Sequence, residues 1–329
     1  MKRASERPRI AVAVRLPEAA AALLEGRADV WISPHDRALT AAELHAAVAG
    51  VDGAVVSLGN RIDDAFLDAS GPQLRVVANI GVGYDNVDVA ACSIRGVVVT
   101  NTPGVLTDAT ADLAFALILI ATRRLGEAER LIRAGRPWRF GLDFMLGTGI
   151  AGKTLGIVGL GQIGSAVARR ARASGMEIAY TGRNRVSREL EQELGARFLP
   201  FDDLLVTADV ISLHTPLNDA TRGMIDAAAL RRMKPTAFLV NTSRGPIVDE
   251  AALVRALGDG TIAGAGLDVY EKEPAVHPGL LELENVVLLP HLGSATVETR
   301  TAMAVLAARN ALAVALGEPP LTPVVPARP

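Results

Sequence analysis

Short apolar runs alternate along the whole chain with alanine- and leucine-rich stretches that have helical periodicity. In the first part of the chain, the apolar runs predict strands at 9–14, 54–56, 74–78 and 97–100. The stretches between them predict helices over 38–49, 63–69 and 86–94. Strands and helices that alternate in this way are typical of a parallel sheet with helices on both faces. We therefore predict an α/β fold.

A long helix is expected from Asp108 to as far as Ala134, followed by an irregular aromatic loop. Strand and helix alternation then restarts, with strands expected at 154–158, 177–181, 210–213, 237–241, 263–267 and 286–289. A final helix is expected from about Ala295 to Leu316, and the proline-rich tail after it is predicted to be extended. A chain of 329 residues is long enough for about two domains. The pattern thus predicts two doubly wound parallel-sheet domains.

Composition narrows the class of partner. The net charge is −2 and charges of both signs are mixed, which argues against nucleic acid or an anionic membrane as the main partner. The longest strongly apolar run, 113–121, is too short to cross a bilayer, and no secretory signal is recognisable. Cys92 is the single cysteine, so a reducing, cytoplasmic location is expected. No set of residues has metal-ligand spacing, so we expect no metal.

One glycine pattern directly follows a predicted strand and precedes a predicted helix. Gly159, Gly161 and Gly164 form Gly-x-Gly-x-x-Gly, which in this context is typical of dinucleotide binding. The first glycine makes the tight turn, the second allows a pyrophosphate to approach, and the third lets helix and strand pack closely. The helix N-terminus then binds the phosphates. The alternative is an ordinary strand-to-helix turn.

The glycine pattern also divides the chain. It usually follows the first strand of its domain, so the nucleotide domain should begin after about residue 100. The final helix is then the natural segment to return to the first domain. We predict a discontinuous, flavodoxin-like substrate domain (1–101 and 291–329) and a Rossmann-type dinucleotide domain (102–290), with an active-site cleft between them.

The end of the second strand of that domain indicates which dinucleotide is preferred. NAD-specific folds place an acidic residue there, but this chain has Gly182, Arg183, Asn184 and Arg185. Arginine forms forked, charge-assisted contacts with phosphate. We therefore predict a preference for NADP, with NAD possible, and the alternative is a solvated basic loop with no ligand.

Three polar segments follow predicted strands of the same domain, at 241–245, 267–274 and 290–294. They carry Arg244, Glu273 and His291, and ligands of open α/β sheets bind beyond such strand ends. Arginine matches a carboxylate, histidine transfers a proton near neutral pH, and glutamate orients the imidazole. Together they suit hydride transfer to a 2-keto acid. Taken singly, each could instead be a surface ion pair, a solvated acid or a helix cap.

The chain resembles the D-isomer-specific 2-hydroxyacid dehydrogenase family, in particular its glyoxylate/hydroxypyruvate reductase branch. The residues that carry the resemblance are 79–85 (Asn-Ile-Gly-Val-Gly-Tyr-Asp), 101–108, the glycine pattern, 241–245, 268–274 and 290–294. The resemblance covers nearly the whole chain. It implies catalytic roles for Arg244, Glu273 and His291, and Glu273 fits the family position better than Glu271 because it directly precedes Pro274.

The resemblance also implies the remaining contacts. Substrate is expected at Leu58, Val82, Gly83, Arg244 and His291. Dinucleotide is expected at Thr107, Gly159, Gly161, Gln162, Ile163, Gly164, Gly182, Arg183, Asn184, Arg185, His214, Thr215, Pro216, Thr242, Ser243, Asp268 and Gly293. The branch typically forms homodimers through the nucleotide domain, in which Trp138 either reaches the partner's active site or simply packs in the interface.

The expected activity is NAD(P)H-dependent reduction of glyoxylate or hydroxypyruvate to the D-2-hydroxy acid, with His291 as the proton donor. The same residues would serve phosphoglycerate, 2-ketogluconate or another 2-keto acid. A different class, a dinucleotide-sensing interaction protein of the same fold, is less favoured because the three catalytic candidates are all present.

Overall fold

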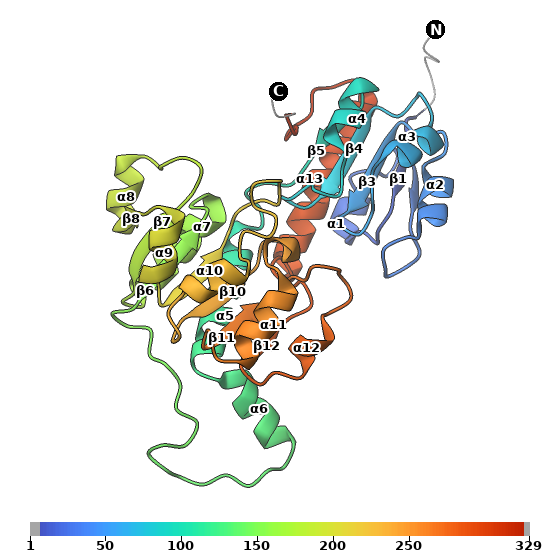
Figure 1. The fold of residues 1–329 in the computed structure, drawn as a ribbon. Coiled ribbons are helices and arrows are strands. Elements are labelled where there is room, and N and C mark those ends of the chain that lie inside the picture. Colours follow the sequence, from blue (N-terminus) through green and yellow to red (C-terminus); the bar gives the residue numbers. More distant parts are fainter. Residues whose placement is uncertain (1–6, 326–329) are drawn as a thin grey trace. The chain divides into compact units, whose positions relative to one another are not determined.

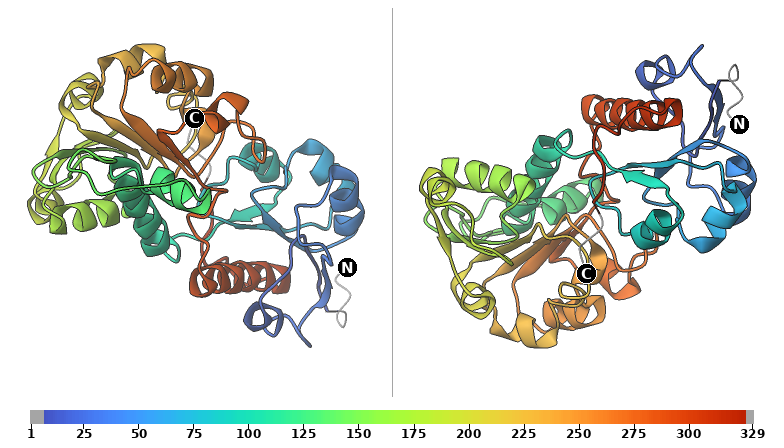
Figure 2. Two further views of the ribbon diagram at one scale, coloured as in Figure 1. Left: turned by 90° about the horizontal axis from the view of Figure 1, so that it is seen from below. Right: turned by 90° about the horizontal axis from the view of Figure 1, so that it is seen from above.

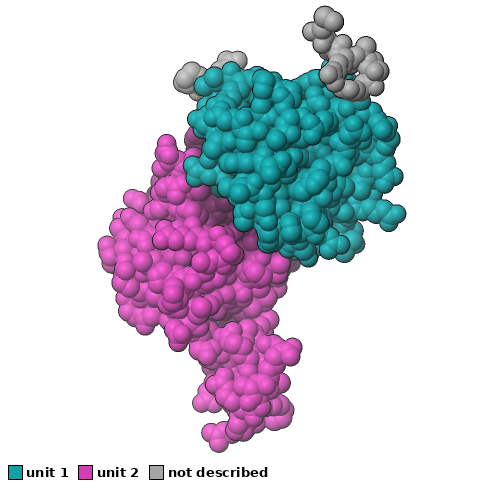
Figure 3. All heavy atoms as spheres, turned by 90° about the vertical axis from the view of Figure 1, so that its right-hand side faces the viewer, with its two compact units in different colours: residues 1–106, 295–329 teal, residues 107–294 magenta. Residues whose placement is uncertain are grey.

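The computed structural model describes residues 7–325, which fall into two compact units (Figures 1 and 3). Of the described residues, unit 1 contains 7–106 and 295–325, and unit 2 contains Thr107–Ser294. Each unit has its own parallel sheet, as the alternation of strands and helices predicts.

Unit 1 has a five-stranded sheet in the order β2-β1-β3-β4-β5, the flavodoxin-like order. Its strands are β1 (Arg9–Val12), β2 (Asp29–Ile32), β3 (Gly53–Ser57), β4 (Val76–Ile80) and β5 (Val98–Thr100). Its helices are α1 (Glu18–Ala21), α2 (Ala41–Val48), α3 (Asp64–Ser70), α4 (Val89–Ile94) and α13 (Val297–Leu316).

Helices cover both faces of this sheet. Phe66 of α3 and Cys92 of α4 belong to the core on one face. Ala308 of α13 belongs to the core on the other, where the long helix lies against the sheet (Figure 2). Thus α13, from the far end of the chain, completes the unit that the first residues begin. It begins at Val297, two residues later than predicted, because Thr296 caps it by accepting from the N–H of Thr299.

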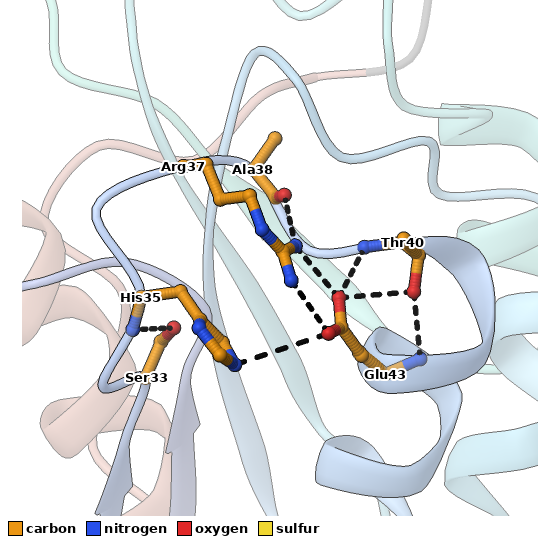
Figure 4. A network of polar contacts seen from close by, with 6 residues as sticks. All are labelled: Ser33, His35, Arg37, Ala38, Thr40 and Glu43. Carbon is orange, nitrogen blue, oxygen red and sulfur yellow. Dashed lines mark hydrogen bonds and ion pairs between the residues drawn. The ribbon is translucent and has the colours of Figure 1, made fainter.

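The start of α2 shows how side chains set an element boundary (Figure 4). Thr40 accepts from the backbone N–H of Glu43, and the Glu43 carboxylate accepts from the backbone N–H of Thr40, which completes a capping box. Arg37 donates to both oxygens of Glu43, and this pairing lowers the pKa of the carboxyl well below its usual range. The helix therefore begins at Ala41, three residues later than predicted.

Unit 2 has a seven-stranded sheet in the order β12-β11-β10-β9-β6-β7-β8, which places the strand-order reversal between β6 and β9. Its strands are β6 (Thr154–Val158), β7 (Glu177–Thr181), β8 (Ala196–Phe198), β9 (Val210–Leu213), β10 (Phe238–Asn241), β11 (Gly264–Leu267) and β12 (Val286–Leu288). Its helices are α5 (Thr107–Thr122), α6 (Leu125–Arg133), α7 (Gln162–Ala173), α8 (Arg188–Leu194), α9 (Phe201–Thr207), α10 (Ala227–Arg232), α11 (Glu250–Gly258), α12 (Pro278–Leu281) and the short 3₁₀ helix η1 (Gly245–Ile247).

Two separate apolar cores cover the two faces of this sheet. Residues of α5 and α7 pack on one face, and residues of α10 and α11 pack on the other (Figure 2). Both units are thus doubly wound parallel-sheet domains, and the predicted fold class is confirmed. The described part of the chain contains no helix that is both long and apolar enough to span a membrane.

The predicted helix from 108 to 134 is wrong in one respect, because the structure divides it. α5 ends at Thr122, and Arg124 adopts a left-handed φ of 55° before α6 begins. The segment after α6 returns to this point, where the N–H of Thr148 donates to the carbonyl of Thr122. Because this carbonyl accepts a hydrogen bond from a residue outside the helix, α5 ends at Thr122 and the chain turns before α6.

Two short strands, β2 and β8, were not predicted from the sequence. β2 has four residues and β8 has three, so both are too short to give a clear periodic pattern. The unit boundaries also differ from the predicted ones: 102–106 lie in unit 1 and 291–294 in unit 2. The N–H of His291 donates to the carbonyl of Asp268 in the loop after β11, which keeps this segment with unit 2.

Candidate active site

All the strands of unit 2 run parallel, so their carboxyl ends share one edge of the sheet. The segments that the sequence singles out follow these ends. Arg244 follows β10, Glu273 lies in the loop after β11, and His291 follows β12. The three candidate catalytic residues therefore come from three neighbouring strands of one sheet.

Glu273 and His291 form a hydrogen-bonded couple. The distance from His291 Nδ1 to Glu273 Oε2 is 2.7 Å, and both side chains are about one-third exposed (33% and 34%). The other carboxylate oxygen accepts from the N–H of Tyr270 at 3.0 Å. Burial acts to raise the pKa of Glu273, but the hydrogen bond and the charge of His291 outweigh it, so the pKa lies below its usual value. The carboxylate is therefore held in its charged form beside the imidazole.

Asp268 fixes the backbone that carries His291. Its carboxylate accepts from the N–H groups of Leu292 at 2.6 Å and Gly293 at 2.8 Å, and its carbonyl accepts from the N–H of His291 at 2.9 Å. His291 has a left-handed φ of 53°, which is uncommon for a residue with a side chain and which these bonds maintain. Burial raises the pKa of Asp268, and the two N–H groups oppose that shift.

The loop after β10 is organised by Asn241. Its side-chain amide donates to the carbonyl of Arg244 at 2.9 Å, and its amide oxygen accepts from the N–H of Ser243 at 3.0 Å. Ser243 also donates its hydroxyl to the carbonyl of Leu213, which ties the loop to the neighbouring strand β9. The positive charge of Arg244 contributes to the lowered pKa of Glu273. The guanidinium and the carboxylate–imidazole couple therefore act on one another within unit 2.

The backbones of two of these loops meet at Gly245. A Cβ placed there would lie 1.9 Å from the carbonyl carbon of Tyr270 and 2.4 Å from the nitrogen of Glu271. No side chain can be accommodated at such distances, so only glycine allows this approach. The residue after Arg244 thus packs against the peptide between Tyr270 and Glu271.

The glycine turn after β6 has the geometry that its pattern predicts. Gly159 has a φ of 95°, and a Cβ at Gly164 would lie 2.2 Å from the carbonyl oxygen of Gly159. Around Gly161, in contrast, a Cβ would meet nothing within 4 Å. Gly161 is the N-cap of α7, where no side chain accepts from the first N–H groups and the first turn has no acid. These N–H groups are available for an anion.

A carboxylate from α8, that of Glu191, reaches the loop after β7. Arg185 donates from Nε to Oε1 of Glu191 at 2.7 Å and from an Nη to Oε2 at 2.8 Å. The hydroxyl of the buried Tyr180 donates to the same carboxylate at 2.6 Å, and the pKa of Glu191 is lowered to about 2 by these partners. No acid directly follows β7 in the sequence, but Glu191 reaches Arg185 from α8. Arg183 is exposed and has no hydrogen-bond or ion-pair partner among the described residues.

The His214, Thr215 and Pro216 segment follows β9, next to the glycine turn. The Nε2 atom of His214 lies 2.8 Å from the hydroxyl oxygen of Ser212, and burial lowers the pKa of His214 to about 4. A Cβ at Gly159 would lie 2.7 Å from the carbonyl oxygen of His214, so the two strand ends are in direct contact. His214 is thus a neutral imidazole at neutral pH.

The predicted substrate residues Leu58, Val82 and Gly83 lie in unit 1. The side-chain amide of Asn79 donates to the carbonyl of Gly83, and that of Asn101 donates to the carbonyl of Val82. These two bonds hold the turn after β4 in a defined conformation.

The comparison with protein families identifies unit 2. Residues 115–293, more than half of the chain, match the model described as "D-isomer specific 2-hydroxyacid dehydrogenase, NAD binding domain". The glyoxylate reductase of Thermococcus kodakarensis is 48% identical over 320 residues, covering 96% of each chain. The chain belongs to the D-isomer-specific 2-hydroxyacid dehydrogenase family.

Solved structures agree with this assignment to the D-2-hydroxyacid dehydrogenases. An NADPH-dependent glyoxylate/hydroxypyruvate reductase from Sinorhizobium meliloti, in complex with NADP and malonate, is 40% identical with a TM-score of 0.84, covering 97% of each chain. The TT0316 protein from Thermus thermophilus is 42% identical with a TM-score of 0.89, covering 96% of this chain and 100% of that one. A D-mandelate dehydrogenase from Rhodotorula graminis is 29% identical with a TM-score of 0.88, covering 97% and 98%.

Several further residues surround this candidate site that no sequence pattern predicts. Glu250 and Glu191 are buried acids that accept hydrogen bonds from loops at the strand ends, and Tyr270 joins two of those loops. Each of these residues bonds a partner in another segment of the chain. No local sequence pattern therefore predicts the contact. The described residues contain no group of acids, histidines and cysteines that could hold a metal ion.

Proposed function

We propose that this D-2-hydroxyacid dehydrogenase reduces glyoxylate or hydroxypyruvate to the D-2-hydroxy acid, with His291 as the proton donor. The observation that supports this most directly is the couple of Glu273 and His291, with Nδ1 and Oε2 2.7 Å apart. An imidazole whose Nδ1 is bonded to a carboxylate has Nε2 left for a substrate. The Glu273 carboxylate thereby fixes the orientation of the ring.

Arg244 is proposed to bind the carboxylate of the keto acid and to polarise its ketone. A guanidinium offers parallel N–H groups that match a carboxylate, and Arg244 lies in the segment that packs on the peptide between Tyr270 and Glu271. His291 then donates its proton from Nε2 to the ketone oxygen as the alkoxide develops. Leu58, Val82 and Gly83 are proposed to contact the substrate, in agreement with the order that Asn79 and Asn101 give to the turn after β4.

The unit 2 residues fit a nicotinamide dinucleotide. The first turn of α7 has no capping side chain, and Gly161 leaves open space where the pyrophosphate would approach. The buried hydroxyl of Thr242 has no hydrogen-bond partner among the described residues, which suits a ligand at this strand end. When bound, the dinucleotide supplies the hydride that reduces the ketone carbon.

NADP is the proposed preference. Arg183 is exposed without an ion-pair partner among the described residues, whereas Arg185 is already held by Glu191. We therefore assign recognition of the 2′-phosphate to Arg183, with Gly182 and Asn184 beside it. The relative from Sinorhizobium meliloti, whose name states NADPH dependence and whose structure contains NADP, supports this preference.

A homodimer is proposed to form through α6 and the loop after it. This segment of unit 2 projects from the sheet in Figure 1, and none of the residues of α6 is buried. The segment has these exposed large apolar side chains: Leu125, Ile132, Trp138, Phe140, Leu142, Phe144 and Leu146. An exposed apolar segment of this size is typical of a protein–protein interface. A second copy of the chain would cover it, and the position of Trp138 in that interface stays a prediction.

A substrate panel tests the proposed function. Purified full-length chain is assayed with NADPH and with NADH against glyoxylate, hydroxypyruvate, 2-ketogluconate and phenylpyruvate, and the chirality of each product is determined. We expect the highest kcat/KM with glyoxylate or hydroxypyruvate and NADPH. A higher value with phenylpyruvate would favour bulkier 2-keto acids, as the name of the mandelate dehydrogenase relative suggests. Tight dinucleotide binding with no turnover would favour the sensing protein instead.

A further inference from the structure

Glu250 is a buried acid that none of the roles above uses. It is the first residue of α11, directly after the cap Asp249, and only 5% of it is exposed. Its Oε1 atom accepts from the backbone N–H of Glu271 at 2.6 Å. The side chain therefore turns away from solvent and bonds the loop that carries Glu273.

The peptide between Tyr270 and Glu271 is held from several sides. The N–H of Tyr270 donates to Glu273, and its hydroxyl donates to the carbonyl of Leu289, two residues before His291. Gly245, the neighbour of Arg244, packs against the same peptide. Those contacts come from the catalytic loops themselves. The bond to Glu250 differs, because it connects this peptide to the first turn of α11.

Burial of a carboxylate at this position lowers the stability of the fold unless its hydrogen bonds compensate for the lost hydration. A buried carboxylate loses hydration, and burial raises the pKa of Glu250 accordingly. Two features offset the loss: the N–H of Glu271 and the positive end of α11, whose first turn contains the carboxylate. At this position of α11, the side chain therefore serves as a hydrogen-bond acceptor for the loop after β11.

We propose that Glu250 is a positioning residue, which holds the Tyr270–Glu271 peptide so that the Glu273 carboxylate meets Nδ1 of His291. This proposal rests on the proposed function, since it assigns Glu250 a part in the same proton transfer. In this proposal Glu250 has no contact with substrate or dinucleotide. It acts on the rate only through the orientation of Glu273 and the imidazole.

The test compares Glu250→Ala, Glu250→Gln and Glu271→Ala in the full-length chain. The alanine variant should lower kcat by about 10- to 100-fold, because a misplacement of a catalytic group by about 1 Å can cost about 100-fold in rate. The KM for glyoxylate and the Kd for NADPH should stay close to the wild-type values. Glu250→Gln should recover most of kcat, because the amide oxygen accepts the same bond. Glu271→Ala is the matched control, since it removes an exposed acid of the same loop but keeps the N–H, and it should leave kcat unchanged.

Equal kcat for Glu250→Ala and wild type would overturn the proposal. So would equal losses in the alanine and glutamine variants with KM, Kd and the unfolding temperature all impaired, since that indicates a general structural role. If the alanine variant does not fold, Glu250→Asp replaces it: its shorter side chain withdraws the acceptor, and a kcat equal to that of Glu250→Gln would reject the idea. Failure of the proposed function looks different, because the wild type itself would then reduce no 2-keto acid.

Discussion

Strands β10, β11 and β12 of unit 2 end in loops that hydrogen bonds hold in place. The turn after β6 and Arg183 in the loop after β7 instead offer donors that no side chain among the described residues occupies. On the first side, Asp268 accepts from two consecutive N–H groups and Glu273 is bonded to both Tyr270 and His291. On the second side, α7 has no capping side chain, and Arg183 has no ion-pair partner within residues 7–325.

The difference agrees with what each side is proposed to do. A proton donor and its orienting carboxylate must lie within a fraction of an ångström of the productive geometry, so their loops are fixed in advance. Phosphate groups bring their own charge and accept hydrogen bonds, so their donors remain unpaired until the ligand binds. Changes on the two sides should therefore differ: kcat falls on the first, and dinucleotide affinity falls on the second.

The largest effect is expected for His291→Ala. Removal of a positioned general acid costs about 10²–10⁴ in rate, so kcat should fall by this factor while the Kd for NADPH stays close to wild type. Steady-state assays with glyoxylate and fluorescence titration with NADPH measure the two quantities. His45→Ala, on α2 of unit 1, is the control. A variant that retains most of its kcat would show that His291 is not the proton donor.

The second largest effect is expected for Gly245→Ala, which should disturb the loops after β10 and β11. The added Cβ would lie 1.9 Å from a backbone atom of Tyr270, so the two loops must separate. We expect a loss of stability of about 1–3 kcal/mol or more, together with a lower kcat. Gly258→Ala, at the end of α11, meets nothing within 4 Å and should leave both unchanged or raise stability slightly. Urea unfolding and steady-state assays decide, and wild-type behaviour of Gly245→Ala would contradict the close approach.

The distribution of fixed and open groups also explains what was predictable from the sequence. Gly159, Arg244, Glu273 and His291 follow strands, and parallel strands bring their carboxyl ends to one edge, so their shared location follows from the alternation of elements. The bond between Glu250 and Glu271 joins two elements 21 residues apart, and no periodicity marks it. The sequence therefore predicts the site residues at the strand ends, but it does not predict buried helical residues such as Glu250 that bond to their loops.

The break between α5 and α6 was hidden for a similar reason. The residues around Arg124 include no glycine or proline on the N-terminal side of the turn, so helical periodicity continues through it. The turn depends on the N–H of Thr148, which bonds the carbonyl of Thr122 after the chain has returned from α6. A contact between segments so far apart overrides the local preference.

On the open side, Arg183→Gln and Arg185→Gln form a matched pair. Loss of a charge-assisted bond to phosphate costs about 1.5–3 kcal/mol, so Arg183→Gln should raise the Kd for NADPH by about tenfold or more. The Kd for NADH should change little, because NADH has no 2′-phosphate. Arg185→Gln should have the smaller effect on NADPH, since Glu191 already occupies its guanidinium. Fluorescence titration of both variants with both dinucleotides tests this, and the reverse order would transfer the phosphate contact to Arg185.

The smallest effect is expected for the stability contributed by Glu191, which lies on α8 and bonds Arg185 in the loop after β7. Its pKa is lowered to about 2, below the ordinary value of 4.5, by Arg185 and Tyr180. A carboxyl with a lowered pKa in the folded state stabilises the protein above the ordinary pKa, and this contribution disappears as the pH falls from 4.5 towards 2. Glu191→Gln should therefore be less stable than wild type at pH 7, and the difference should shrink in that acidic window. Urea unfolding across the pH range measures it, with Glu193→Gln, a surface acid of the same helix, as the control for net charge. A difference that stays constant with pH would show that the loop depends on the shape of Glu191 and not on its charge.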